Sequence, residues 1–392
     1  MTLFLALWLV GQLIAVVLIW HFVWSVGRPA GSGATPPVAI VVAVKGHDIE
    51  FDGFLEGVFA QDYPAFRIIF GVETADDEAV PAIERYRAAY PGRVTLVAAG
   101  RADNESQKIT NVRAALPELT PADEVLVFAD ADIWPQRDWL RRVVGPLMRG
   151  EADAVSAYPW LIAYDHRFST LLLMCISAGV ATAPRHPSWD SAWGGVMGIT
   201  HARFDELGIA EAWRGAMSED LQLTRRVQKG KGVLAPRELL MRTPIVTNGM
   251  AHIVDQARRW YMLVRVHAPL TYGIAVVVTT FNAVGWLVAA YAALAGAPTG
   301  ITVFFVAIAL AILRTVARAA LVARLWGRSG LAENRWFLLF DWAMTPVATI
   351  ASAILAWSSL RMRRTTWAGT TYEVRGPQHI RIIARSGGPT ET

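Results

Sequence analysis

The chain has 392 residues, enough for one catalytic domain and an additional module. Hydrophobic residues make up 54% of it and charged residues only 18%, and the apolar surplus lies at the two ends, which argues against a soluble enzyme. The net charge is +4 and the pI about 9.3, but no basic run is interleaved with aromatic residues, so an anionic membrane face is favoured over nucleic acid as the partner.

The first element is an apolar segment from Leu3 to Val26, long enough to cross a bilayer. No basic residue precedes it and no small-residue cleavage site is evident, so we predict a transmembrane anchor over residues 1–26 and not a removable signal peptide. Arg28 and more positive charge follow, which by the positive-inside rule places the next domain in the cytosol. The Gly-, Pro- and Ser-rich residues 27–37 are typical of a linker.

Residues 38–255 are predicted to form a globular domain in which short β-rich runs alternate with helical patterns. In chain order we expect a strand at 38–44, a helix at 49–60, a strand at 67–72, a helix at 78–90, a strand at 94–98, a helix at 107–116 and a strand at 124–129. This alternation indicates βαβ units and an α/β fold with a mostly parallel sheet. Ligands of such sheets bind beyond the carboxyl ends of the strands.

A shorter apolar run, Thr170–Ala183, cannot span a bilayer and predicts a buried or interfacial helix. It contains Cys175, and because this is the single cysteine of the chain, an internal disulfide and a cysteine-based zinc site are excluded.

The C-terminal third is again apolar. An amphipathic interfacial helix is expected at 256–268, two to three membrane segments within 269–360, and a basic cytosolic tail at 361–392. The apolar stretches are 269–295, 301–326 and 337–360; three crossings would put the tail on the wrong side, so one stretch is expected to be re-entrant or interfacial. Arg314, Arg318, Arg324 and Asp341 within them should face a bundle interior, a cavity or the headgroups.

The sharpest chemical signal is Asp130–Ala131–Asp132, directly after an apolar strand and followed by Pro135. Two carboxylates on alternate residues can both reach a hard cation, and Mg²⁺ or Mn²⁺ held by Asp130 and Asp132 would bridge to a nucleotide diphosphate. The alternative is a turn with two solvated aspartates. The strand before the motif and the proline after it favour the metal site.

With this motif the chain begins to resemble the family 2 inverting glycosyltransferases, which have a GT-A fold. Ser218–Glu219–Asp220 resembles the acidic motif whose aspartate is the catalytic base in that family, and Gln256, Arg259 and Trp260 match its Q-x-x-R-W pattern. Each motif alone is weak, but the three occur in the family's order between an N-terminal anchor and C-terminal membrane segments.

The resemblance implies roles for these residues. Asp220 would be the base that takes the proton of the attacking hydroxyl. Glu219 would be structural, would line the acceptor side, or would itself be the base. Gln256 and Arg259 would bind the donor pyrophosphate, and Trp260 would form a flat wall for the acceptor. The same segment would also make a good interfacial helix, and both interpretations can hold together.

A closer resemblance is to ceramide glucosyltransferase and bacterial hopanoid-associated glycosyltransferases, over about residues 38–372. It is carried by Lys45–Gly46, by Gln61–Pro64, by Lys108 with Asn111, and by a C-terminal group of Trp367, Gly369 and Tyr372. It implies that Lys45, Lys108 and Asp130 contact the donor nucleotide.

Two further residues are predicted from their positions. The acidic residue that contacts the nucleobase in this group falls at Glu73 or Thr74, with Asp76 and Asp77 displaced, and Glu73 is preferred because it ends a strand. Gly195, within the glycine-rich residues 194–198, would let the backbone approach the acceptor, or would simply form a turn.

Three functions are compatible with these features. The first is transfer of one sugar from a UDP-sugar to a ceramide, hopanoid or glycerolipid hydroxyl by an integral membrane protein, expected in a bacterial inner membrane with its catalytic domain in the cytoplasm. The second is a processive polysaccharide synthase of the cellulose or hyaluronan type, which would need more membrane helices to line a channel. The third, a non-catalytic transporter or scaffold, does not explain two carboxylates at a strand end.

Overall fold

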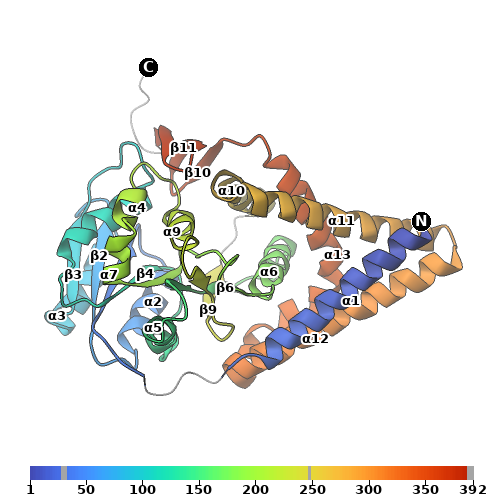
Figure 1. The fold of residues 1–392 in the computed structure, drawn as a ribbon, viewed down its shortest axis with the longest axis horizontal. Helices are drawn as coiled ribbons and strands as arrows, with labels where there is room; N and C mark the ends of the chain where they lie inside the picture. The colour runs from blue at the N-terminus through green and yellow to red at the C-terminus, as the bar shows by residue number, and fades with distance from the viewer. Residues whose placement is uncertain (28–32, 246–248, 386–392) are drawn as a thin grey trace. The chain divides into compact units, whose positions relative to one another are not determined.

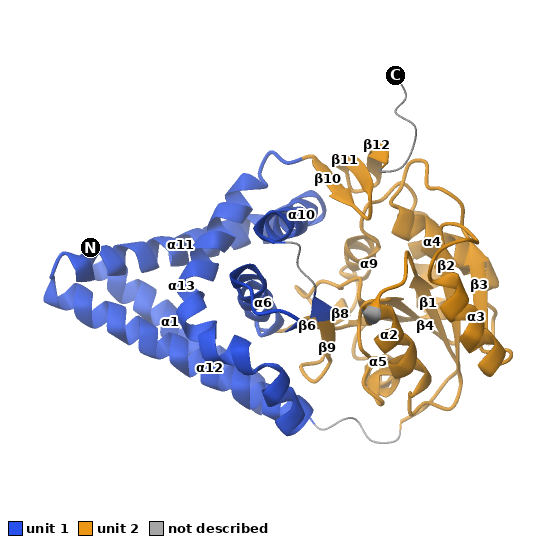
Figure 2. Ribbon diagram, turned by 180° about the vertical axis from the view of Figure 1, so that it is seen from behind, with its two compact units in different colours: residues 1–27, 160–184, 244–362 blue, residues 28–159, 185–243, 363–392 orange. Residues whose placement is uncertain are grey.

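The computed structural model describes residues 1–27, 33–245 and 249–385, and the chain forms two compact units (Figures 1 and 2). Unit 1 comprises residues 1–27, 160–184 and 244–362, and unit 2 comprises residues 28–159, 185–243 and 363–392. Arg28 and parts of the predicted linker and tail, at 28–32 and 386–392, lie outside the described residues.

Unit 2 is built on a seven-stranded sheet of order β3-β2-β1-β4-β7-β5-β8. The first four strands of that order are parallel to their neighbours, β7 is antiparallel to β4 and β5, and β8 is parallel to β5. The predicted mostly parallel sheet is confirmed. The strands are β1 (Val38–Ala43), β2 (Phe66–Val72), β3 (Val94–Ala98), β4 (Val125–Asp130), β5 (Ala154–Ser156), β7 (Val196–Thr200) and β8 (Val233–Leu234).

Helices cover both faces of this sheet, and each face has its own core. Ile40 of β1 packs in one core and its neighbour Val41 in the other, because successive side chains of a strand point to opposite faces. The first core includes α2 (Ile49–Phe59), α3 (Val80–Ala89) and α5 (Trp139–Met148); the second includes α4 (Gln107–Ala115), α7 (His201–Glu206), α8 (Ile209–Ala212) and α9 (Glu219–Val227). A short 3₁₀ helix (Leu116–Glu118) follows α4.

Residues of the predicted basic tail form a second sheet of unit 2. Strands β10 (Arg364–Trp367), β11 (Thr370–Gly376) and β12 (His379–Arg385) pair antiparallel in that order. Thr370, Tyr372 and Val374 are buried alternately along β11, which is the period of a half-buried strand. Thr371 and Glu373 stand between them and are less buried, so the sequence predicted a basic tail where the structure has a strand.

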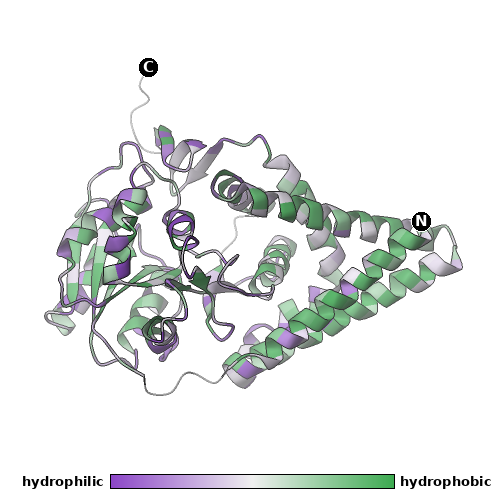
Figure 3. Cartoon of the chain, viewed as in Figure 1, coloured by the Kyte–Doolittle hydropathy of each residue, from purple (hydrophilic) through white to green (hydrophobic). Residues whose placement is uncertain are grey.

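Unit 1 consists mainly of helices: α1 (Thr2–Trp24), α6 (Phe168–Ala181), α10 (Met250–His267), α11 (Pro269–Leu294), α12 (Pro298–Glu333) and α13 (Arg335–Ser358). Among the described residues, α1, α11, α12 and α13 are long and apolar enough to cross a membrane, and Figure 3 shows their hydrophobic character. The chain passes between the two units within β6 (Tyr158–Ala163) and β9 (Leu240–Ile245).

Unit 1 encloses charged side chains, as predicted for charges in apolar segments. Arg318 of α12 and Asp341 of α13 are buried and paired at 2.5 Å. Thr315 donates a hydrogen bond of 2.7 Å to the same carboxylate, and the Cys175 thiol of α6 lies 3.3 Å from it. Because the described ion pair is surrounded by hydrogen-bond donors, the charge of Asp341 is well compensated.

Candidate active site

Lys108 joins the two acidic motifs of unit 2. It projects from the first turn of α4, and its Nζ lies 2.5 Å from Asp130 Oδ1 and 2.5 Å from Glu219 Oε1. The Lys108 side chain is 13% exposed and the Glu219 side chain 4%. Burial alone would lower the pKa of Lys108, but the carboxylates of Asp130 and Glu219 outweigh it and raise that pKa, so the lysine stays charged.

The carboxylates after β4 fit a divalent cation. Asp130 ends the strand, and Asp132 is exposed two residues later in the turn. The pKa of Asp132 is raised mainly because the surrounding protein displaces part of its hydration, and further by the negative charge of Asp130. None of the ion pairs in the described part of the chain involves Asp132. Mg²⁺ is commonly held by one or two carboxylates plus substrate phosphates, so two aspartates suffice, and no cluster of three or more metal-binding side chains occurs among the described residues.

Asp220 is positioned by hydrogen bonds at the start of α9. Its Oδ1 accepts from the Ser218 hydroxyl and from the Leu221 N–H (2.7 Å), and its Oδ2 accepts from the Gly194 N–H (3.0 Å). Asp220 is partly exposed, whereas Glu219 is buried against Lys108. Burial raises the pKa of Glu219 to about 7, although Lys108 opposes this rise. A carboxylate has about four acceptor sites, so Asp220 can accept a hydrogen bond from one more donor.

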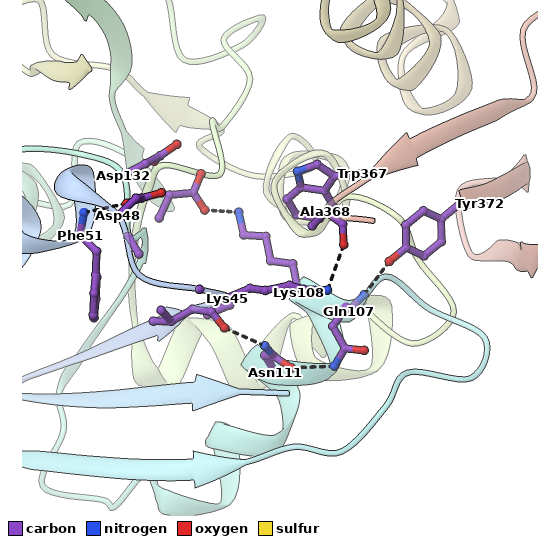
Figure 4. Close-up of a pocket in the computed structure, with 15 residues that line it drawn as sticks. Lys45, Asp48, Phe51, Gln107, Lys108, Asn111, Asp132, Trp367, Ala368 and Tyr372 are labelled. Atoms are coloured by element: carbon purple, nitrogen blue, oxygen red, sulfur yellow. Dashed lines mark hydrogen bonds and ion pairs between the residues drawn. The ribbon is translucent and has the colours of Figure 1, made fainter. Parts of the chain in front are cut away.

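A cavity of about 330 Å³ lies beside these groups (Figure 4). Predicted residues that line it are Lys45, Lys108, Asp130 and Asp132. It is also lined by three residues that were not predicted from the sequence: Asp48, Phe51 and Gln107. Asp48 caps α2 by accepting from the Phe51 N–H at 3.1 Å, and an aspartate just before a helical pattern is the signal that could have located it.

Glu73 lies just beyond the end of β2, as predicted, but is not among the described residues that line the cavity. Its carboxylate is surrounded by cations: Lys45 lies 3.4 Å away, Arg101 3.7 Å and Arg385 3.8 Å. Contact of Glu73 with a nucleobase stays a prediction.

The predicted acceptor glycine lies in the same unit. Gly195 is buried, and a Cβ at this position would overlap the indole ring of Trp193. At Gly194 a Cβ would come within 2.6 Å of Glu219 Oε1 and 2.8 Å of Lys108 Nζ, so the backbone passes very close to the ion bridge. A larger residue at position 194 would therefore have to displace the end of the Glu219 or the Lys108 side chain.

Gln256, Arg259 and Trp260 belong to unit 1, where they lie on α10. The spacings of three and four residues place them along one side of the helix. Burial lowers the pKa of Arg259, and Trp260 is 36% exposed. Their assignment to donor and acceptor stays a prediction.

The mixed sheet with acidic residues at the end of its central strand β4 is of the GT-A type, which defines the class as a glycosyltransferase that uses a nucleotide-sugar. The chain belongs to glycosyl transferase family 21, whose model matches residues 3–380. The resemblance to the ceramide glucosyltransferase group is therefore confirmed at the level of the family. No curated protein matches the chain.

Several solved structures are similar to it. The Pyrobaculum calidifontis mannosyltransferase PcManGT, in complex with GDP-Man and Mn²⁺, has 17% identity and a TM-score of 0.48, with 92% of this chain and 99% of that chain covered. S. aureus TarS 1–349, in complex with UDP-GlcNAc, has 11% identity and a TM-score of 0.41, with coverages of 89% and 99%. Glucosyl-3-phosphoglycerate synthase from Mycobacterium tuberculosis has 14% identity and a TM-score of 0.39, with coverages of 61% and 85%.

Proposed function

We propose that this chain transfers a single sugar, with inversion, from a UDP-sugar to the hydroxyl of a membrane lipid such as a ceramide, a hopanoid or a glycerolipid. The reaction takes place at the cytoplasmic face of the membrane and depends on Mg²⁺ or Mn²⁺. The observation that carries this proposal is the Lys108 bridge, which holds Asp130 of the donor motif and Glu219 of the base motif within 2.5 Å of one ammonium group.

The proposed reaction is one displacement. The acceptor oxygen forms a bond to the anomeric carbon while the bond from that carbon to the diphosphate oxygen breaks, and UDP leaves. Asp220 takes the hydroxyl proton, because it is partly exposed and held in place by Gly194 and Leu221, whereas Glu219 is buried and committed to Lys108. A divalent cation bound by Asp130 and Asp132 would neutralise charge on the departing diphosphate.

A lipid acceptor is supported by the composition of unit 1. Its long helices expose large apolar side chains along their length, among them Leu13, Val277 and Phe305, each more than half exposed. Such surfaces are stable in a bilayer, where a lipid hydroxyl at the interface meets the enzyme without leaving the membrane.

The contacts of α13 support an arrangement of the crossings. α11 and α12 form a hairpin that turns at residues 295–297. Tyr272, near the start of α11, donates a 2.8 Å hydrogen bond to the Ala356 carbonyl near the end of α13. Thr315 of α12 donates one of 2.7 Å to Asp341, near the start of α13. At about 1.5 Å per residue, Tyr272 lies about 33 Å and Thr315 about 26 Å from the turn, so both parts of α13 contact the half of the hairpin that is farther from its turn.

On this basis we propose that α1, α11 and α12 cross the membrane and that α13 lies along its cytoplasmic face, which would return the chain to the side of the catalytic unit. Cysteines placed at Thr299 and at Arg361, in a Cys175→Ser background, test this with a membrane-impermeant maleimide on sealed vesicles. We expect labelling of the two positions from opposite sides. Labelling of both from the same side would mean that α13 crosses.

The function is tested by incubating the purified protein with a panel of UDP-sugars and membrane lipids. We expect a singly glycosylated lipid, no product after EDTA treatment, and recovery when Mn²⁺ or Mg²⁺ is restored. Asp132→Asn and Asp220→Asn should abolish transfer, and Asp205→Asn, a matched change at an aspartate that is 71% exposed, should not. A long carbohydrate product would instead identify a polysaccharide synthase, and full activity of either site variant would refute the site.

A further inference from the structure

The turn between β10 and β11 forms part of the donor cavity. Trp367, Ala368 and Tyr372 line it together with Lys45 and the residues that follow β1 and β4. Figure 4 shows Asp132 and Asp48 on one side of the cavity, and Trp367, Ala368 and Tyr372 on the opposite side. The C-terminal sheet thus supplies two aromatic side chains, Trp367 and Tyr372, to the side of the cavity opposite Asp132.

The C-terminal sheet is held in place by hydrogen bonds between it and the α/β part of unit 2. The Lys45 ammonium donates to the Ala368 carbonyl at 2.9 Å, and the Gln107 N–H donates to the Tyr372 hydroxyl at 3.3 Å. Gln222 donates to the Pro377 carbonyl at 2.5 Å, and Arg385 donates to the Ala102 carbonyl. With anchors on all three strands or their turns, the sheet has a defined position over the cavity.

The turn itself adopts an unusual conformation. Trp367 pairs with Thr370, which leaves the two-residue loop Ala368–Gly369, with φ of 47° and 76°. Ala368 is the one non-glycine residue with positive φ in the described part of the chain. Two-residue turns with positive φ at both positions usually begin with Asn, Asp or Gly. Here an alanine is held in that conformation, with its carbonyl toward Lys45, and such outliers concentrate at ligand sites.

The length of the donor determines which part of it reaches Trp367 and Tyr372. If Asp130 and Asp132 hold the diphosphate, as the proposed function requires, the nucleoside must extend away from them. The opposite end of the cavity is the side of Trp367. Every nucleobase has a π-face, so stacking on an aromatic side chain is a contact that any base can make.

We propose that the β10–β11 turn covers the nucleoside end of the donor cavity and that Trp367 is the surface on which the nucleobase stacks. The inference rests on the proposed use of Asp130 and Asp132 for the diphosphate. Trp367 acts in donor binding and not in the chemical step, so its removal should raise the KM for the UDP-sugar while kcat changes little.

The test uses the full chain in detergent with Mn²⁺ and measures Kd for UDP and inhibition by inorganic pyrophosphate. Trp367→Ala should weaken UDP binding about 5- to 150-fold, the range of one base stack. Trp367→Phe should restore most of it, and inhibition by pyrophosphate, which has no base, should be unchanged. Trp189 is a tryptophan of the same unit that is 59% exposed, and Trp189→Ala is the matched control. It should change neither the Kd for UDP nor the inhibition by pyrophosphate.

Two results would overturn the inference. Equal UDP affinity in Trp367→Ala and the wild type would show that the ring does not stack on the base. An equal loss of UDP and pyrophosphate binding, not rescued by phenylalanine, would show that Trp367 only supports the fold of the cavity. Failure of the wild-type protein to bind UDP would be a different outcome, because it would contradict the proposed donor itself.

Discussion

Replacement of Lys108 by methionine is the most informative single change in unit 2. Lys108→Met keeps the length of the side chain and removes the ammonium group that lies 2.5 Å from both Asp130 and Glu219. Removing one partner of a buried ion pair costs about 3–5 kcal/mol, because the remaining charge stays buried without compensation. For a unit of this size, a loss of about 3–5 kcal/mol corresponds to a fall in Tm of roughly 6–20 °C.

The loss should depend on pH. Burial raises the pKa of Glu219 to about 7 from its ordinary value of 4.5, so the free energy of unfolding falls as the pH rises through that window. Without Lys108 the pKa of Glu219 should rise further, and near neutral pH the carboxyl would be protonated, which limits the damage. The difference in Tm between variant and wild type should therefore widen from pH 6.5 to pH 8.5.

Thermal unfolding of the detergent-purified protein at each pH measures the difference in Tm between Lys108→Met and the wild type. The rate of sugar transfer is measured on the same samples, and Lys108→Met should abolish transfer. Lys229→Met is the matched control, because Lys229 is an exposed lysine of the same unit and its removal should change neither quantity. A Tm equal to that of the wild type at pH 8.5 would refute the ion bridge.

Three further predictions concern other parts of the chain. Gly71→Ala places a Cβ against the backbone carbonyl of Asn111, so it should cost about 1–3 kcal/mol and, by displacing α4, raise the donor KM; an unchanged Tm would contradict the packing of β2 on α4. Burial raises the pKa of Asp190 to about 6 from 3.8, so the folded state disfavours the ionised carboxylate. Asp190→Asn should therefore raise Tm relative to the wild type at pH 8 but not at pH 5. The same difference in Tm between variant and wild type at both pH values would argue against this. Arg318→Met and Asp341→Asn should each lower Tm, and the double variant should lose less than their sum; additivity would mean that the pair is not coupled.

Much of the α/β architecture could be predicted from local patterns. The apolar runs of β1 and β4 are buried on both faces of the sheet and so appear as continuous hydrophobic sequence. Asp130 and Asp132 could be placed because a strand end is readable from the residues before it. The predicted helices match α2 and α4 to within a residue at each end.

The contacts that complete the site could not be predicted. Lys108 meets Glu219 only because α4 and α9 pack on the same face of the sheet, and no local pattern encodes that pairing. Trp367 and Tyr372 were noticed as part of a resemblance, but their position at the cavity depends on the turn at Ala368 and on its bond to Lys45. Long-range contacts of this kind follow from tertiary packing.

The chain changes unit five times, after residues 27, 159, 184, 243 and 362. The strands that carry Trp367 and Tyr372 therefore come after all four long apolar helices of the described residues in the order of synthesis. The cavity lacks two of its aromatic lining residues until the C-terminal sheet has folded against the rest of unit 2, so a nascent chain that ends before residue 363 cannot form it completely. For the same reason no truncation from either end can release the catalytic unit intact, and a soluble version would need a rejoined chain order.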